Sequence, residues 1–105
     1  MIRVCAVEDV PPGEGRNVSV GDLRLAVFRT DSGWYATEAG CPHMQGPLAD
    51  GIVADASVIC PLHERRFSLQ TGAEINGSLC VKTYRAVVHR DDVYILADVP
   101  VLAGA

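Results

Sequence analysis

The sequence predicts an all-β domain, and three observations carry that prediction. Short runs rich in β-branched residues alternate with turn residues along most of the chain. No stretch shows an apolar period of 3.6 residues over the length of a helix. The length of 105 residues suits one domain with a single core.

The expected strands can be placed in order from these runs. Gly21-Asp22 and Asp91-Asp92 each separate two apolar runs and predict two-residue hairpin turns, and Thr30–Gly33 predicts a third turn. The expected strands are residues 2–7, 17–20, 23–28, 34–38, 52–54, 57–59, 66–69, 80–90 and 93–97.

The middle of the chain differs from both flanks. Residues 39–78 contain three of the six prolines and only short strand-like runs. We expect this stretch to be too small and too rich in loops to bury a core of its own, so that something else must hold it. A metal centre is a common solution in such a case.

Composition and charge exclude some classes of partner. The formal net charge is -4 with a pI of about 5.2, and a single lysine and eight scattered arginines offer no phosphate-binding face, which argues against nucleic acid. No apolar run approaches the roughly 18 residues of a membrane span. The N-terminus lacks the features of a signal peptide, so we expect a cytoplasmic protein without structural disulfides.

Two thiol and imidazole pairs stand out within the middle stretch. One residue lies between Cys41 and His43, two residues lie between Cys60 and His63, and 16 residues lie between the two pairs. Two thiolates and two imidazoles suit a structural zinc ion, or a Rieske [2Fe-2S] cluster in which two histidines replace two cysteines on one iron.

The spacing of the pairs favours the two-iron cluster. Structural zinc sites usually place two to four residues between paired ligands, and Cys41-x-His43 is tight for one small ion. A cluster is wider, so Cys41 and Cys60 can share one iron while His43 and His63 share the other. A zinc-stabilised interaction module remains the alternative, and visible absorption separates the two, since zinc has none.

The ligand pattern and the segments around it resemble a known protein family over nearly the whole chain. C-x-H, 16 residues and C-x-x-H form the ligand pattern of the Rieske-type ferredoxins, and "CPHMQGPLADG" and "VICPLHERRFSLQTG" resemble their two cluster-binding loops. "KTYRAVVHRDDVYI" resembles the closing strands. The opening "VEDVPPGEGRNVSVGDLRLAVFRT" is similar to the small subunit of NAD(P)H-dependent nitrite reductase and to the ferredoxins of aromatic-ring dioxygenases.

The resemblance implies a fold and a cofactor. It implies one Rieske ISP-like domain over residues 1–105, in which a cluster-binding subdomain at roughly 40–70 is inserted into a β-sandwich base of residues 1–39 and 71–105. One [2Fe-2S] cluster per chain would be held by Cys41, His43, Cys60 and His63.

Function follows from the same ligand set. With two cysteines and two histidines bound, the irons offer no open position to a substrate, so we expect no catalysis by this chain itself. We expect it to carry single electrons between a flavoprotein or NAD(P)H-dependent reductase and a terminal oxygenase or reductase. The alternative is the small subunit of an assimilatory nitrite reductase, with the large subunit as its partner.

Departures from the respiratory Rieske proteins predict a low potential. Those proteins carry an extra loop disulfide, where Leu62 stands here, and two hydroxyl side chains at the positions of Arg65 and Phe67. Fewer donors to sulfur stabilise the reduced cluster less. The two remaining cysteines, Cys5 and Cys80, lie in strand-like runs and are predicted to be buried free thiols.

Overall fold

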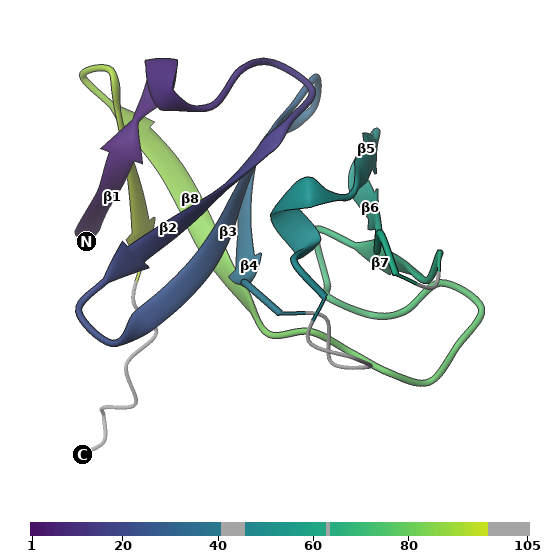
Figure 1. Ribbon diagram of the computed structural model, residues 1–105. Helices are drawn as coiled ribbons and strands as arrows, with labels where there is room; N and C mark the ends of the chain where they lie inside the picture. Colours follow the sequence, from purple (N-terminus) through teal and green to yellow (C-terminus); the bar gives the residue numbers. More distant parts are fainter. Residues whose placement is uncertain (41–45, 63, 97–105) are drawn as a thin grey trace.

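Two antiparallel sheets of unequal size make up the structure, a computed structural model that describes residues 1–40, 46–62 and 64–96 (Figure 1). The two 3-10 helices are single turns, and in the described part of the chain no helix is long and apolar enough to cross a bilayer. The elements are β1 (Ile2–Ala6), η1 (Val7–Asp9), β2 (Gly15–Val20), β3 (Leu23–Thr30), β4 (Gly33–Glu38), η2 (Leu48–Asp50), β5 (Ile52–Ala54), β6 (Ser57–Ile59), β7 (Arg66–Ser68), β8 (Thr83–His89) and β9 (Asp92–Leu96).

The larger sheet, which we call the base, has six strands in the order β1-β9-β8-β4-β3-β2. It curls so that its two halves face one another across a buried core, with β1 and β8 on one side and β2 and β3 crossing in front (Figure 1). All strand pairs are antiparallel, and the first and last strands pair from Ile2 opposite Ile95. The buried residues of this base core are Val4, Cys5, Val10, Leu25, Val27, Ala36, Val93 and Ile95.

The hairpins of the base test the predicted turns. β2 ends at Val20 and β3 begins at Leu23, so the Gly21-Asp22 turn is confirmed. The turn between β8 and β9 is Arg90-Asp91, one residue earlier than predicted. Arg90 and Asp91 both have a positive φ, of 53° and 67°, as a two-residue hairpin of the primed kind requires.

The strand β3 is buried on both faces. Leu25 and Val27 point into the base core, while Ala26 and Phe28 point to the opposite side, and all four are fully buried. Side chains alternate across a strand, so a run of four buried residues requires cover on both sides. The three-stranded sheet and its loops supply the second cover.

The small unit is the segment between β4 and β8 in the sequence, and it carries the sheet β5-β6-β7 (Figure 1, right). Its core is not its own, because Ala26 and Phe28 of β3 contribute to it. The buried residues of this small core are Ala26, Phe28, Leu48, Ala49, Val58, Cys60, Phe67, Leu69 and Val81.

The loop that follows β7 also packs with the small unit. Phe67 forms a bridge with Glu74, and Ala73 forms a bridge with Cys80. Val81 donates its N–H to the carbonyl of Gly72 and is buried in the small core. The boundary placed at about residue 70 therefore falls inside this closed loop.

The two cysteines outside the ligand pairs differ from each other. Cys5 is buried on β1, as predicted, and burial, followed by the nearby Asp9, raises the pKa of its thiol. Cys80 is exposed, so the prediction of burial is wrong for it. The reason is local: β8 begins only at Thr83, and Cys80 lies in the loop before it.

Candidate metal centre

One of the four predicted ligands, Cys60, lies among the described residues. Cys41, His43 and His63 lie outside them. The site is therefore described through Cys60 and through the segments on which the predicted ligands are carried.

Cys60 follows β6 directly and is almost completely buried, with 1% of its surface exposed. Two backbone hydrogen bonds close the loop that it opens: its N–H donates to the carbonyl of Arg65 (2.7 Å), and its carbonyl accepts the N–H of Glu64 (3.1 Å). Glu64 has a φ of 56°, in the left-handed region. The chain thus reverses tightly right after the predicted ligand His63.

The loop with Cys41 and His43 is closed at its base in a similar way. Gly40 and Pro47 form an antiparallel bridge, and the N–H of Leu48 donates to the carbonyl of Ala39 (3.1 Å). Leu48 then begins η2 and is fully buried in the small core. Both ends of this loop are therefore anchored, one by β4 and the other by η2.

The two loops meet at the Cys60 sulfur. A Cβ added to Gly46, at the end of the first loop, would lie 3.2 Å from Cys60 Sγ and 2.9 Å from Leu62 Cδ1. A side chain at Gly46 would fill the space beside the sulfur, so the close approach of the loops depends on glycine here. A buried thiol beside Gly46, which follows the segment with the other predicted cysteine and histidine, fits an iron–sulfur group held by both loops.

An ion pair that the sequence analysis missed lies behind this loop. Arg65 Nη1 is 2.8 Å from Glu74 Oε2, and the Glu74 side chain is only 6% exposed. The sequence marks Arg65 only as a position without a hydroxyl. Nothing in the sequence marks Glu74 as its partner, because eight residues, including the strand β7, lie between the two.

The other departure, Phe67, is a core residue. It is fully buried on β7, opposite Val58 of β6, and packs in the small core. Its ring therefore has a structural role in holding the sheet that precedes and follows the Cys60 loop.

Several apolar residues of the small unit are exposed. Leu62 is 51% exposed and Ile75 is 43% exposed, and Pro61 is exposed next to Leu62. Of these, Leu62 directly precedes the predicted ligand His63 in the sequence.

Comparison with known proteins agrees with this arrangement. The sequence profile of the Rieske [2Fe-2S] domain matches residues 1–87. The biphenyl dioxygenase ferredoxin subunit of Pseudomonas sp. (strain KKS102) is 32% identical over 96 residues, which cover 89% of this chain and 88% of that protein.

Two solved structures extend the comparison. A structure of the complex of reduced oxygenase and oxidized ferredoxin in carbazole 1,9a-dioxygenase matches with a TM-score of 0.80 and 32% identity, covering 90% of this chain and 100% of the matched chain. The nitrite reductase [NAD(P)H] small subunit from Erwinia carotovora matches with a TM-score of 0.76 and 32% identity, covering 92% of this chain and 82% of that one.

Proposed function

The chain belongs to the Rieske [2Fe-2S] family and binds one such cluster, and from that premise we propose how its own residues make it a ferredoxin. The expected fold class and cofactor are confirmed by the same comparisons. The zinc alternative loses its support, because the matched family is a [2Fe-2S] domain.

The proposed ligands are Cys41, His43, Cys60 and His63. The observation that carries the proposal is the close approach of Gly46 to the buried Cys60 sulfur, where a Cβ on Gly46 would lie 3.2 Å from Cys60 Sγ, because it places the end of one ligand loop beside the start of the other. Both loops also have closed bases, at Gly40 and Pro47 and at Cys60 and Arg65.

When bound, a cluster of this kind accepts and returns one electron. The chain contributes three things to that chemistry. The small core excludes water from the Cys60 side, and the closed loops hold the ligands in place. The exposed Leu62, next to His63, leaves one edge of the site open to a partner.

We propose a reductase and a terminal oxygenase as the redox partners. Ferredoxin subunits of dioxygenases are similar to this chain over most of their length, and the matched carbazole 1,9a-dioxygenase structure is a complex of ferredoxin with oxygenase. The second candidate is the small subunit of a nitrite reductase, which the similarity to the Erwinia carotovora protein favours. A stable large-subunit partner in a pull-down would support this second candidate.

We also propose that the protein works in the cytoplasm. Among the described residues, Cys5 and Cys80, which are not proposed ligands, form no disulfide. Reduced cysteines that do not pair are the usual state in a reducing compartment.

Metal and sulfide analysis of the anaerobically purified protein tests the cofactor and its ligands. We expect two irons and two acid-labile sulfides per chain, with a visible spectrum. Alanine at Cys41, His43, Cys60 or His63 should each abolish that spectrum. One zinc ion without sulfide would contradict the proposal.

Stopped-flow reduction tests the proposed partner edge. Glu64→Gln removes an exposed charge next to His63 and should leave the spectrum intact. The rate of electron exchange and its salt dependence should change, by up to about tenfold, because rim charges act on association. An unaltered rate at every ionic strength would mean that this edge is not the contact surface.

A further inference from the structure

The ion pair between Arg65 and Glu74 is built into the small unit on several sides. Glu74 Oε2 accepts from Arg65 at 2.8 Å, and Glu74 Oε1 accepts the backbone N–H of Leu79 at 3.2 Å. Two further backbone hydrogen bonds hold the surrounding segment: Glu74 N–H to the carbonyl of Leu79 (2.9 Å), and Ile75 N–H to the carbonyl of Arg66 (2.8 Å).

The Glu74 carboxylate also fits closely under the loop that contains Gly77. A Cβ added to Gly77 would collide with the carboxyl group of Glu74, so the loop passes directly over the carboxylate. A carboxylate that is 6% exposed is stable as an anion only when it is paired and hydrogen-bonded. Arg65 and the Leu79 N–H meet that requirement.

The same arginine closes the loop that begins at Cys60. Its carbonyl accepts the Cys60 N–H at 2.7 Å, while its side chain reaches Glu74. Arg65 therefore joins the backbone of a predicted ligand to a buried anion. The Arg65 guanidinium is therefore one side-chain length from the Arg65 backbone, which contacts Cys60.

We propose that Arg65 and Glu74 are positioning residues for the cluster, and that their opposite charges set its potential in opposite directions. The inference rests on the proposed cluster-carrying function. Glu74 fixes the Arg65 side chain, and Arg65 fixes the Cys60 loop in the conformation that holds the cluster. Outer residues of this kind orient ligands and tune the bound group.

Charge gives the proposal a signature that a purely structural role lacks. Reduction adds a negative charge to the site, so the cationic Arg65 favours the reduced state and the anionic Glu74 disfavours it. Arg65→Gln should lower the potential, and Glu74→Gln should raise it. A pair that only held the loop would shift the potential in the same direction on losing either member.

The experiment compares four forms of the full-length, cluster-loaded protein: wild type, Arg65→Gln, Glu74→Gln and Arg65→Lys. Film voltammetry at mildly alkaline pH gives the potential, and the decay of visible absorption in the presence of an iron chelator gives the rate of cluster loss. We expect both glutamine variants to lose the cluster about 10-fold to 100-fold faster. Arg65→Lys keeps the charge, so its potential should stay near that of the wild type.

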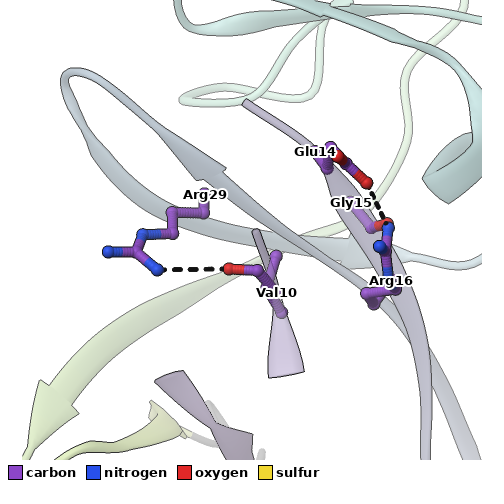
Figure 2. Close-up of polar contacts among 5 residues, drawn as sticks. All are labelled: Val10, Glu14, Gly15, Arg16 and Arg29. Atoms are coloured by element: carbon purple, nitrogen blue, oxygen red, sulfur yellow. Dashed lines mark hydrogen bonds and ion pairs between the residues drawn. The ribbon is translucent and has the colours of Figure 1, made fainter. Parts of the chain in front are cut away.

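A matched control lies at the start of β2. Arg16 and Glu14 form an ion pair with the same 2.8 Å separation, and both side chains are about half exposed (Figure 2). Arg16→Gln and Glu14→Gln should change neither the potential nor the rate of cluster loss. If either control variant matches its counterpart at Arg65 or Glu74, the proposal is wrong.

Two other outcomes would overturn the inference. One is a shift of the potential in the same direction for Arg65→Gln and Glu74→Gln, and the other is wild-type potential and cluster retention in both. If Glu74→Gln does not fold, the sign for Arg65→Gln against Arg65→Lys still decides, because Arg65 is more exposed. A wild-type protein without iron and sulfide would instead refute the proposed function.

Discussion

The base and the small unit are stabilised in different ways. In the base, strands of five to eight residues pair around a core of their own. The strand β2 contributes little to that core, because few of its six residues are buried. In the small unit, β5, β6 and β7 have three residues each, and the core depends on Ala26 and Phe28 from the base. We therefore expect the base to form without the small unit, whereas the small unit should need the base.

The difference assigns most of the stability to the base and the proposed function to the small unit. The proposed ligands belong to the loops of the small unit, and the base presents the face of β3 on which that unit packs. Loops positioned by a rigid scaffold are a common place for functional residues. Each of the following changes affects one side of this division.

Loss of a ligand should have the largest effect on the small unit. Cys60→Ala should abolish the visible absorption completely, because it removes a proposed ligand of the cluster. The strand signal in far-ultraviolet circular dichroism should persist, since the base core contains none of the predicted ligands. Loss of that signal would show that the base depends on the cluster.

The two faces of β3 offer the most direct separation. Phe28→Ala should cost about 3–5 kcal/mol and Leu25→Ala about 2–5 kcal/mol of unfolding free energy, because both side chains are fully buried. Phe28→Ala should open the small unit selectively, and Leu25→Ala should open both bodies. Amide hydrogen exchange, read separately for β8 and for β6, measures this; equal effects on both strands in both variants would contradict it.

A hydroxyl in the small core should change the potential with little loss of fold. Phe67→Tyr should raise it by roughly 40 mV if the new O–H donates to a cluster or ligand sulfur with about 1 kcal/mol more strength in the reduced state. The wild-type value should lie low in the Rieske range of about -150 to +300 mV, since Arg65 and Phe67 have no hydroxyl. Voltammetry of both proteins measures the wild-type potential and its shift in Phe67→Tyr. A wild-type potential near the top of the range would refute the prediction of a low potential.

The smallest effect concerns the backbone of the Cys60 loop. Glu64 has a φ of 56°, which costs a non-glycine residue about 1 kcal/mol and costs glycine little. Glu64→Gly should therefore raise the unfolding free energy of the small unit by up to about 1 kcal/mol. Chemical denaturation followed by visible absorption measures it, and Asp55→Gly, at a φ of 54° in the turn between β5 and β6, is the matched control.

Local patterns in the sequence were sufficient for most strands of the base. The run that includes Leu25 and Phe28 predicted β3, because four consecutive apolar residues between turns require a buried strand. Gly21 marked one hairpin, while the hairpin at Arg90-Asp91 carries no glycine and was placed one residue too late. The ligand spacing predicted the kind of site before any contact was known.

Contacts between distant segments could not be predicted in the same way. The small core forms only when Phe67 and Val81 reach β3, and a strand propensity says nothing of that partner. The exposure of Cys80 and the pairing of Arg65 with Glu74 both follow from the path of the loop after β7. Such a path is set by packing across many residues rather than by local preference.

The pairing of β1 with β9 has a consequence for the order in which the chain folds. Ile2 lies opposite Ile95, so these partners are 93 positions apart in the sequence. Contacts of such long sequence separation slow folding, because the intervening chain must be ordered or looped out first. The base therefore closes only after synthesis has passed β9, by which time β5, β6 and β7 and the segments that carry the four proposed ligands have all been synthesised.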